Sequence, residues 1–159
     1  MGLDAALLRV MRTRLHQPPV ERAVAAFSRL GEHSMVWFAL SGAGALLDRP
    51  RRSEWIRAGT VVAVSYVANQ AVKFAVRRPR PSMIDLPPLT ATMSNRSYPS
   101  NHATTCGAAA IAYAELVPPA LLVPFTVAMT LTRPYLGVHY PSDSLAGYAL
   151  GVAVAQIAG

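Results

Sequence analysis

The chain has 159 residues, a net charge of +7 and a composition that is 52% apolar but only 14% charged. Soluble domains usually contain about a quarter charged residues, so this composition favours a single membrane-associated domain over 1–159. A nucleic-acid-binding domain would gather its basic residues among stacking aromatic side chains. Here the basic residues lie between apolar segments, which excludes nucleic acid as the expected partner. Cys106 is the only cysteine, so an intrachain disulfide and a thiolate zinc cluster are excluded as well.

Residues 1–30 predict an amphipathic segment that lies in the membrane interface. Within 1–17, apolar residues such as Leu15 alternate with Arg9, Arg12 and Arg14, and the segment lacks the unbroken apolar stretch of a secretory signal. Basic amphipathic helices of this kind bury their apolar face at the headgroup boundary.

Five stretches without Asp, Glu, Lys or Arg follow, at 33–47, 58–72, 97–114, 116–132 and 144–159. Each is slightly shorter than the ~20 residues that cross a bilayer core, and long basic side chains at its ends could extend it. Buried helices of a soluble bundle are the alternative interpretation. The stretches fill so much of the chain, however, that little sequence remains for a polar outer face. We therefore expect an all-α membrane bundle with about five short transmembrane helices over 31–159.

Prolines and polar residues mark the ends of these stretches. Pro50 lies in a polar turn between the first two, and Pro141 opens the fifth, where proline fits the first helical turn. Pro124 lies inside the fourth stretch and should kink that helix. The one long connection, 77–99, is rich in proline, and loops of this length in compact domains are commonly functional.

Three polar clusters carry the functional signal, and the first closes the second apolar stretch. Lys73 and Arg77 lie one helical turn apart and therefore share a face. Prolines stop the helix just beyond them, so Arg80 can fold back over its end. Gathered cations suit an anion with several oxygens, such as phosphate. Taken alone, this cluster would be interpreted as an ordinary basic membrane flank.

The second and third clusters each contain a histidine. Ser100 is a favourable N-cap, which puts His102 in the first turn of the third helix, where free backbone N–H groups favour a bound anion. His139 precedes Asp143 by four residues, a spacing that invites a carboxylate–imidazole hydrogen bond and leaves the other ring nitrogen free to attack. A simple cap, an interfacial histidine and a satisfied loop histidine are the alternatives. Two helices separate these clusters, so all three are expected on the same side of the bundle as the N-terminus.

In chain order, Lys-x6-Arg-Pro, Pro-Ser-x-His and Arg-x5-His-x3-Asp occupy the region from Lys73 to Asp143. Together they resemble the signature of the type 2 phosphatidic-acid phosphatase superfamily, which includes lipid phosphatases, polyprenyl pyrophosphate phosphatases, glucose-6-phosphatases and vanadium haloperoxidases. The chain departs from this pattern at Asn101, where the family usually has glycine, and at Thr132, where it usually has serine. These two changes could alter the backbone donors to phosphate but remove no expected catalytic side chain.

The resemblance implies a metal-independent phosphoric monoester hydrolase with a histidine nucleophile and no cofactor. By this resemblance, His139 attacks phosphorus to form a phosphohistidine, Asp143 orients its ring, and His102 protonates the leaving oxygen and then activates water. The side chains expected to hold the phosphoryl oxygens are Lys73, Arg80, Ser100, Asn101 and Arg133. No metal site is expected, because fixed cations already supply the electrostatic role of a metal.

The expected substrate is a lipid phosphate in the cell membrane. The alanine-, valine- and arginine-rich composition suggests a GC-rich bacterial genome, and the chain looks like small actinobacterial members of the family that act on decaprenylphosphoryl-5-phosphoribose. Phosphatidic acid, phosphatidylglycerol phosphate and polyprenyl pyrophosphate are the alternatives. A vanadium haloperoxidase is disfavoured, because those relatives are larger and soluble, and a non-catalytic protein that binds lipid headgroups is the alternative from another class. Family habit implies a multi-pass protein with an extracytoplasmic site.

Several further residues are expected to have no catalytic role. Solvated interfacial positions are predicted for Arg77, Arg78 and Arg96, with secondary contacts to phosphate or headgroups as the alternative. Interfacial positions away from the three clusters are predicted for His16 and His33. Gly147 and Gly151 form a Gly-xxx-Gly pair that permits close helix packing within the chain or between chains, which leaves a homo-oligomer possible.

Overall fold

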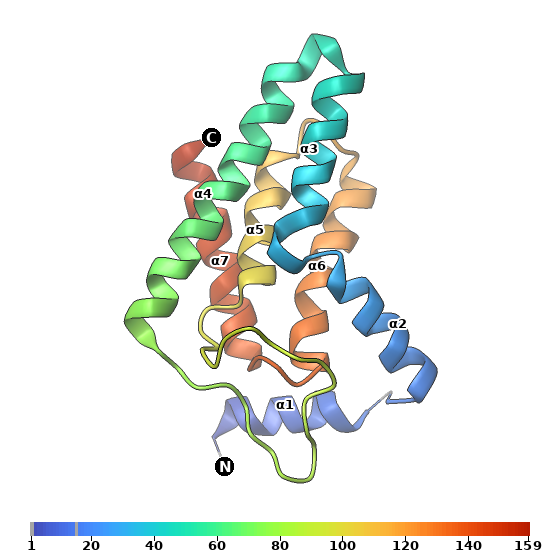
Figure 1. Cartoon of the computed structure of the whole chain (residues 1–159), viewed down its shortest axis with the longest axis vertical. Coiled ribbons are helices and arrows are strands. Elements are labelled where there is room, and N and C mark those ends of the chain that lie inside the picture. The colour runs from blue at the N-terminus through green and yellow to red at the C-terminus, as the bar shows by residue number, and fades with distance from the viewer. Residues whose placement is uncertain (1, 15) are drawn as a thin grey trace.

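The computed structural model describes residues 2–14 and 16–159, and within them it contains helices and one isolated bridge between Pro79 and Arg96. In chain order (Figure 1) the helices are α1 (Leu3–Thr13), α2 (Pro18–Arg29), the 3-10 helix η1 (Glu32–Ser34), α3 (Met35–Leu47), the 3-10 helix η2 (Arg49–Arg51), α4 (Arg52–Val76), α5 (Asn101–Ala112), α6 (Pro119–Tyr135) and α7 (Pro141–Ala158). The all-α class expected from the apolar stretches is confirmed.

Two helices form the N-terminal segment. Helix α1 lies across the end of the bundle at which α6 ends and α7 begins (Figure 1). It buries Leu8 and Arg12 and exposes Leu3 and Leu7, so its two faces differ as expected for an amphipathic helix. Helix α2 starts at Pro18, a residue suited to the first turn because it has no N–H to leave unpaired. The expectation that the periodic pattern extends to Leu15 lies outside the described residues.

The five apolar stretches correspond to α3 through α7, with shifted ends. Helix α4 is much longer than its apolar stretch, because charged residues of both its first and last turns are helical. Helix α5 begins only at Asn101, and Pro141 is the first residue of α7 as expected. Pro124 lies inside α6, which continues to Tyr135.

Within residues 2–14 and 16–159, no helix combines the length and the apolar character needed to cross a membrane. The number of transmembrane helices therefore stays a prediction.

Helix α5 is the central element, and it packs against α4, α6 and α7. Gly147 and Gly151 of α7 face α5, where an added Cβ would collide with the carbonyl oxygens of Ser100 and Thr104. Both glycines are therefore used for close packing within the chain, and the pair no longer argues for a dimer.

The apolar core occupies the middle of the bundle. It contains the buried side chains of Trp37, Trp55, Tyr113 and Met129 together with small residues of α4 and α5. The polar clusters lie beyond this core, at the end of the bundle where α5 and α7 begin, α6 ends and α1 lies across (Figure 1). The apolar packing thus fixes the helix ends that carry the polar side chains.

Candidate active site

A cavity of about 480 Å³ lies at this end of the bundle and brings together residues from four separate segments. The predicted site residues that line it are Lys73, Arg80, Asn101, His102, Arg133 and His139. Ser100 and Asp143 are fully buried immediately behind the lining. Residues that are more than 60 positions apart in the sequence therefore meet at one place, as expected if two helices return the chain to its starting side.

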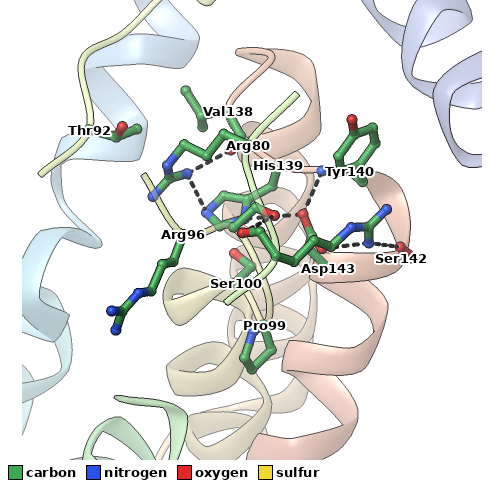
Figure 2. Close-up of polar contacts among 12 residues, drawn as sticks. Arg80, Thr92, Arg96, Pro99, Ser100, Val138, His139, Tyr140, Ser142 and Asp143 are labelled. Atoms are coloured by element: carbon green, nitrogen blue, oxygen red, sulfur yellow. Dashed lines mark hydrogen bonds and ion pairs between the residues drawn. The ribbon is translucent and has the colours of Figure 1, made fainter. Parts of the chain in front are cut away.

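His139 lies between Arg80 and Asp143 (Figure 2). An Arg80 Nη is 3.1 Å from His139 Nε2, and the same nitrogen donates to the Val138 carbonyl at 2.6 Å. A guanidinium can only donate, so Nε2 must carry the lone pair and Nδ1 the proton. Burial lowers the pKa of His139 to about 3, which keeps the ring neutral at physiological pH. Burial also lowers the pKa of Arg80 to about 10, so its guanidinium stays charged.

The hydrogen bond that the sequence predicts between His139 and Asp143 is not formed. His139 Nδ1 and the Asp143 carboxylate are 3.6 Å apart, a separation that permits an ion pair but exceeds hydrogen-bond length. The carboxylate oxygens instead accept from Arg78 and from the backbone N–H of Tyr140, each at 2.8 Å. Asp143 is therefore held rigidly with its charge facing the protonated nitrogen of the ring.

Arg78 belongs to this network, which corrects its assignment as a solvated interfacial arginine. It binds Asp143 with one Nη and Asp4 of α1 with the other, at 2.8 and 2.7 Å. Asp4 also accepts from the backbone N–H and the hydroxyl of Ser142, in the first turn of α7. The guanidinium lies 4.2 Å above the centre of the Tyr140 ring. Helix α1 is thus connected to the carboxylate behind His139.

A second network connects α2 to the other histidine. His102 Nε2 lies 3.0 Å from the carbonyl oxygen of Ser28. Because a carbonyl can only accept, His102 carries its proton on Nε2 and its lone pair on Nδ1. The Ser28 hydroxyl accepts from Arg133 at 2.8 Å and from Thr132 at 3.2 Å. One residue of α2 therefore holds both His102 and Arg133 in place.

Several polar atoms around the cavity have no hydrogen-bond partner. They are buried, and they include Ser100 Oγ, Asn101 Oδ1 and Arg133 Nε. Ser100 occupies the N-cap position of α5 as predicted, but its hydroxyl makes no capping bond. Lys73 donates to the Pro99 carbonyl at 2.9 Å. Buried polar groups are almost always paired, so the unpaired atoms of Ser100, Asn101 and Arg133 are consistent with a site in which a polar ligand supplies the missing partners.

Part of the cavity lining comes from η1. Glu32 and His33 line it, together with Tyr66 and Gln70 of α4. The expectation that His33 lies away from the clusters is therefore wrong. No signal in the sequence connects η1 with motifs that start 40 residues later, so the sequence alone could not have identified Ser28, Glu32 or Asp4.

Comparisons with known proteins agree with this architecture. The sequence profile of the PAP2 superfamily matches residues 54–158. The decaprenylphosphoryl-5-phosphoribose phosphatase of Mycolicibacterium smegmatis is 42% identical over 149 residues, which cover 92% of this chain and 81% of that protein. Two solved structures share the fold at 22% identity. Aquifex aeolicus LpxE has a TM-score of 0.83 over 99% of this chain and 95% of its own. The transmembrane PAP2-type phosphatidylglycerolphosphate phosphatase of Bacillus subtilis has a TM-score of 0.80 over 98% of this chain and 82% of its own.

The superfamily expected from the three motifs is thus confirmed, since the profile match covers most of the chain and all three motifs lie inside it. The residues that the sequence could not identify, in α1, α2 and η1, precede the matched region. The chain belongs to the PAP2 superfamily, whose type 2 phosphatidic-acid phosphatase signature it carries from Lys73 to Asp143.

Proposed function

We propose that this phosphatase hydrolyses the phosphomonoester of a membrane lipid through a phosphohistidine at His139, and that its substrate is decaprenylphosphoryl-5-phosphoribose. One observation carries the proposal. An unprotonated imidazole nitrogen, His139 Nε2, lies 3.1 Å from Arg80 at a cavity that three cations line, namely Lys73, Arg80 and Arg133. The substrate assignment rests on the similarity to the Mycolicibacterium smegmatis enzyme.

In the first step, the lone pair of His139 Nε2 attacks phosphorus, an N–P bond forms and the bond to the leaving oxygen breaks. The ring becomes positively charged, and the buried Asp143 carboxylate beside Nδ1 stabilises that charge. His102 is anchored through its Nε2–H, so its Nδ1 lone pair first takes the proton of the bound phosphomonoester monoanion and then gives this proton to the leaving oxygen.

In the second step, His102 Nδ1 takes a proton from water, whose oxygen attacks phosphorus, and then passes this proton to the departing inorganic phosphate. The N–P bond breaks, inorganic phosphate leaves and His139 returns to its neutral form. Lys73, Arg80 and Arg133 stabilise the charge on the phosphoryl oxygens in both transition states. The unpaired hydroxyl of Ser100 is available as a further donor to these oxygens.

A membrane location is part of the proposal. The related Bacillus subtilis protein is a transmembrane enzyme with the same fold, and α1 places exposed leucines beside the catalytic end of the bundle. The number of membrane crossings and the extracytoplasmic position of the site stay predictions.

The test measures phosphate release from purified protein in detergent, with decaprenylphosphoryl-5-phosphoribose, phosphatidylglycerol phosphate, phosphatidic acid and a polyprenyl pyrophosphate as substrates. We expect the ribose-containing lipid to have the highest kcat/KM, and we expect His139→Ala to abolish release from every lipid. His16→Ala is the matched control, since His16 stacks on Tyr135 outside the cavity. Near-normal activity of His139→Ala would disprove the nucleophile. Binding of the lipids without any phosphate release would instead identify a headgroup-binding protein.

A further inference from the structure

The cavity is lined by two chemically different groups of residues. One group contains the cations and two histidines, His102 and His139, and the other contains Glu32, His33, Tyr66 and Gln70. A volume of about 480 Å³ lies within the range of sites that hold whole small molecules. The cavity therefore has room for a phosphoryl group and for the part of the substrate that carries it.

Residues on one face of α4 show along which direction the cavity extends from the phosphate-binding side chains. Tyr66, Gln70 and Lys73 follow one another at helical spacing and line the same cavity. Lys73 lies at the phosphate side, and at 1.5 Å per residue Tyr66 lies ~10 Å further along the helix. That distance accommodates one sugar-sized or glycerol-sized unit between the phosphate and the level of Tyr66.

The turn that carries Glu32 is held close to the reacting groups. Gly31 packs against the His102 ring so tightly that an added Cβ would overlap it. The next residues, Glu32 and His33, begin η1, line the cavity and are exposed. His33 and Ser34 have φ angles of 50° and 61°, a left-handed backbone that is costly for residues other than glycine. The contacts of Ser28 with His102 and Arg133 keep this turn in place.

The second group is not suited to bind phosphate. The Glu32 carboxylate would repel a phosphate and interacts favourably with Arg133. In the part of the chain that the structure describes, the side chains of Glu32, Tyr66 and Gln70 have no hydrogen-bond partner. A carboxylate, an amide and a phenol offer acceptors and donors together, which is the combination that hydroxyl groups require.

We propose that Glu32, Gln70 and Tyr66 form a subsite that binds the free hydroxyl groups of the leaving group, with Glu32 as the main acceptor. The subsite selects lipid phosphates whose phosphoryl group sits on a polyol, that is, a sugar or a glycerol, over those without a free hydroxyl group. This inference rests on the proposed lipid phosphatase activity and adds the chemistry that distinguishes its substrates.

The experiment compares three lipids that differ in the hydroxyl groups next to the phosphoryl group. Decaprenylphosphoryl-5-phosphoribose carries a sugar, phosphatidylglycerol phosphate carries a glycerol, and phosphatidic acid offers no free hydroxyl group. We expect Glu32→Ala to lower the ratio of kcat/KM for the hydroxylated lipid over kcat/KM for phosphatidic acid by about tenfold or more, because a hydrogen bond to a charged acceptor is lost. Glu115→Ala, which removes a glutamate outside the cavity, should leave this ratio unchanged.

The two hydroxylated lipids distinguish the sources of the hydroxyl groups. A fall for the ribose lipid alone assigns a sugar to the subsite, and a fall for the glycerol lipid alone assigns a glycerol. An unchanged ratio for both overturns the proposal. So does an equal loss on all three lipids, since Glu32 would then act only through Arg133 or through the fold.

A binding measurement separates this proposal from the proposed function. In the His139→Ala background, which removes the nucleophile, the Kd of each lipid in detergent is measured by titration calorimetry with and without Glu32→Ala. We expect the Kd of the hydroxylated lipid to rise about tenfold while that of phosphatidic acid changes little. This result would stand even if the wild-type protein released no phosphate, and equal Kd values with and without Glu32 would overturn the subsite.

Discussion

The apolar core and the catalytic cavity both bury polar groups, and the hydroxyl of Tyr113 in the core differs from the hydroxyl of Ser100 beside the cavity in its hydrogen bonding. In the core, the fully buried Tyr113 hydroxyl lies 2.6 Å from Ser41 Oγ and donates to the Trp37 carbonyl at 2.8 Å. Around the cavity, Ser100 Oγ and Arg133 Nε are equally shielded from water but have no partner.

The unpaired atoms beside the cavity differ from the unpaired Trp37 Nε1 of the core because they lie next to a cavity lined with cations. A buried polar atom without a partner costs about 1–3 kcal/mol, and a fold selected for stability alone would pair or remove it. The cavity also gathers three cations, and the carboxylate beside His139, Asp143, is already bound to Arg78. An anionic ligand would satisfy the atoms and the charges at once.

Among the variants that compare the cavity with the core, removal of a cavity cation should have the largest effect on kcat/KM. Arg133→Ala is expected to lower kcat/KM by about 10²–10³, because a charged donor to the phosphoryl oxygens is lost from a water-poor site. The measurement is phosphate release, together with competitive inhibition by inorganic phosphate, which should weaken in parallel. Arg57→Ala is the matched control at the far end of the bundle, where Arg57 only donates to the Gly159 carbonyl. A loss below tenfold for Arg133→Ala would show that the cavity cations do not act on the phosphoryl group.

Arg78 provides a second, smaller test, because it stabilises the site without lining the cavity. Arg78→Ala is expected to lower kcat about 10- to 100-fold with little change in KM, since the orientation of Asp143 behind His139 is lost while the phosphate contacts remain. Arg78→Lys should recover part of the loss, and Asp4→Asn should have a weaker effect of the same kind. A rise in KM with unchanged kcat would instead mean that Arg78 contacts the substrate.

The comparison also explains which features the sequence could predict. The core helices follow from their apolar stretches, and the second and third clusters lie at helix ends because Ser100 and Pro141 start helices there. The ends of α4 were missed because charged residues at both ends are helical, so the absence of charge underestimates the helix.

The support of the site was not predictable, since it depends on contacts between distant segments. Asp4 and Ser28 are ordinary residues of amphipathic helices in the sequence, and only the docking of α1 and α2 gives them partners in the site. The spacing of His139 and Asp143 correctly indicated proximity, but it could not give the 3.6 Å separation. That separation depends on Arg78 and the Tyr140 N–H, which compete for the same carboxylate.

The buried histidine should make stability depend on pH. The folded-state pKa of His139, about 3, lies below its ordinary value of 6.5, so between these values the unfolded chain binds more protons than the folded one. The contribution of His139 is complete above pH 6.5 and is lost as the pH falls toward 3. On lowering the pH from 7 to 5, His139→Gln should therefore lose about 2 kcal/mol less unfolding free energy than the wild type. Chemical denaturation at both pH values measures this, and equal losses would show that the ring is not held neutral by burial.

The smallest effect on activity is expected for a variant of the core. Tyr113→Phe removes a hydroxyl that has two partners, Ser41 Oγ and the Trp37 carbonyl, so the unfolding free energy should fall by about 1–2 kcal/mol. The kcat/KM should stay within about twofold of the wild type, because no cavity residue contacts this hydroxyl. Ser41→Ala and the double variant form a cycle that isolates the Ser41–Tyr113 bond. A stability change near zero together with a large loss of activity would mean that the core and the cavity are coupled, and the division between structural and catalytic polar groups would fail.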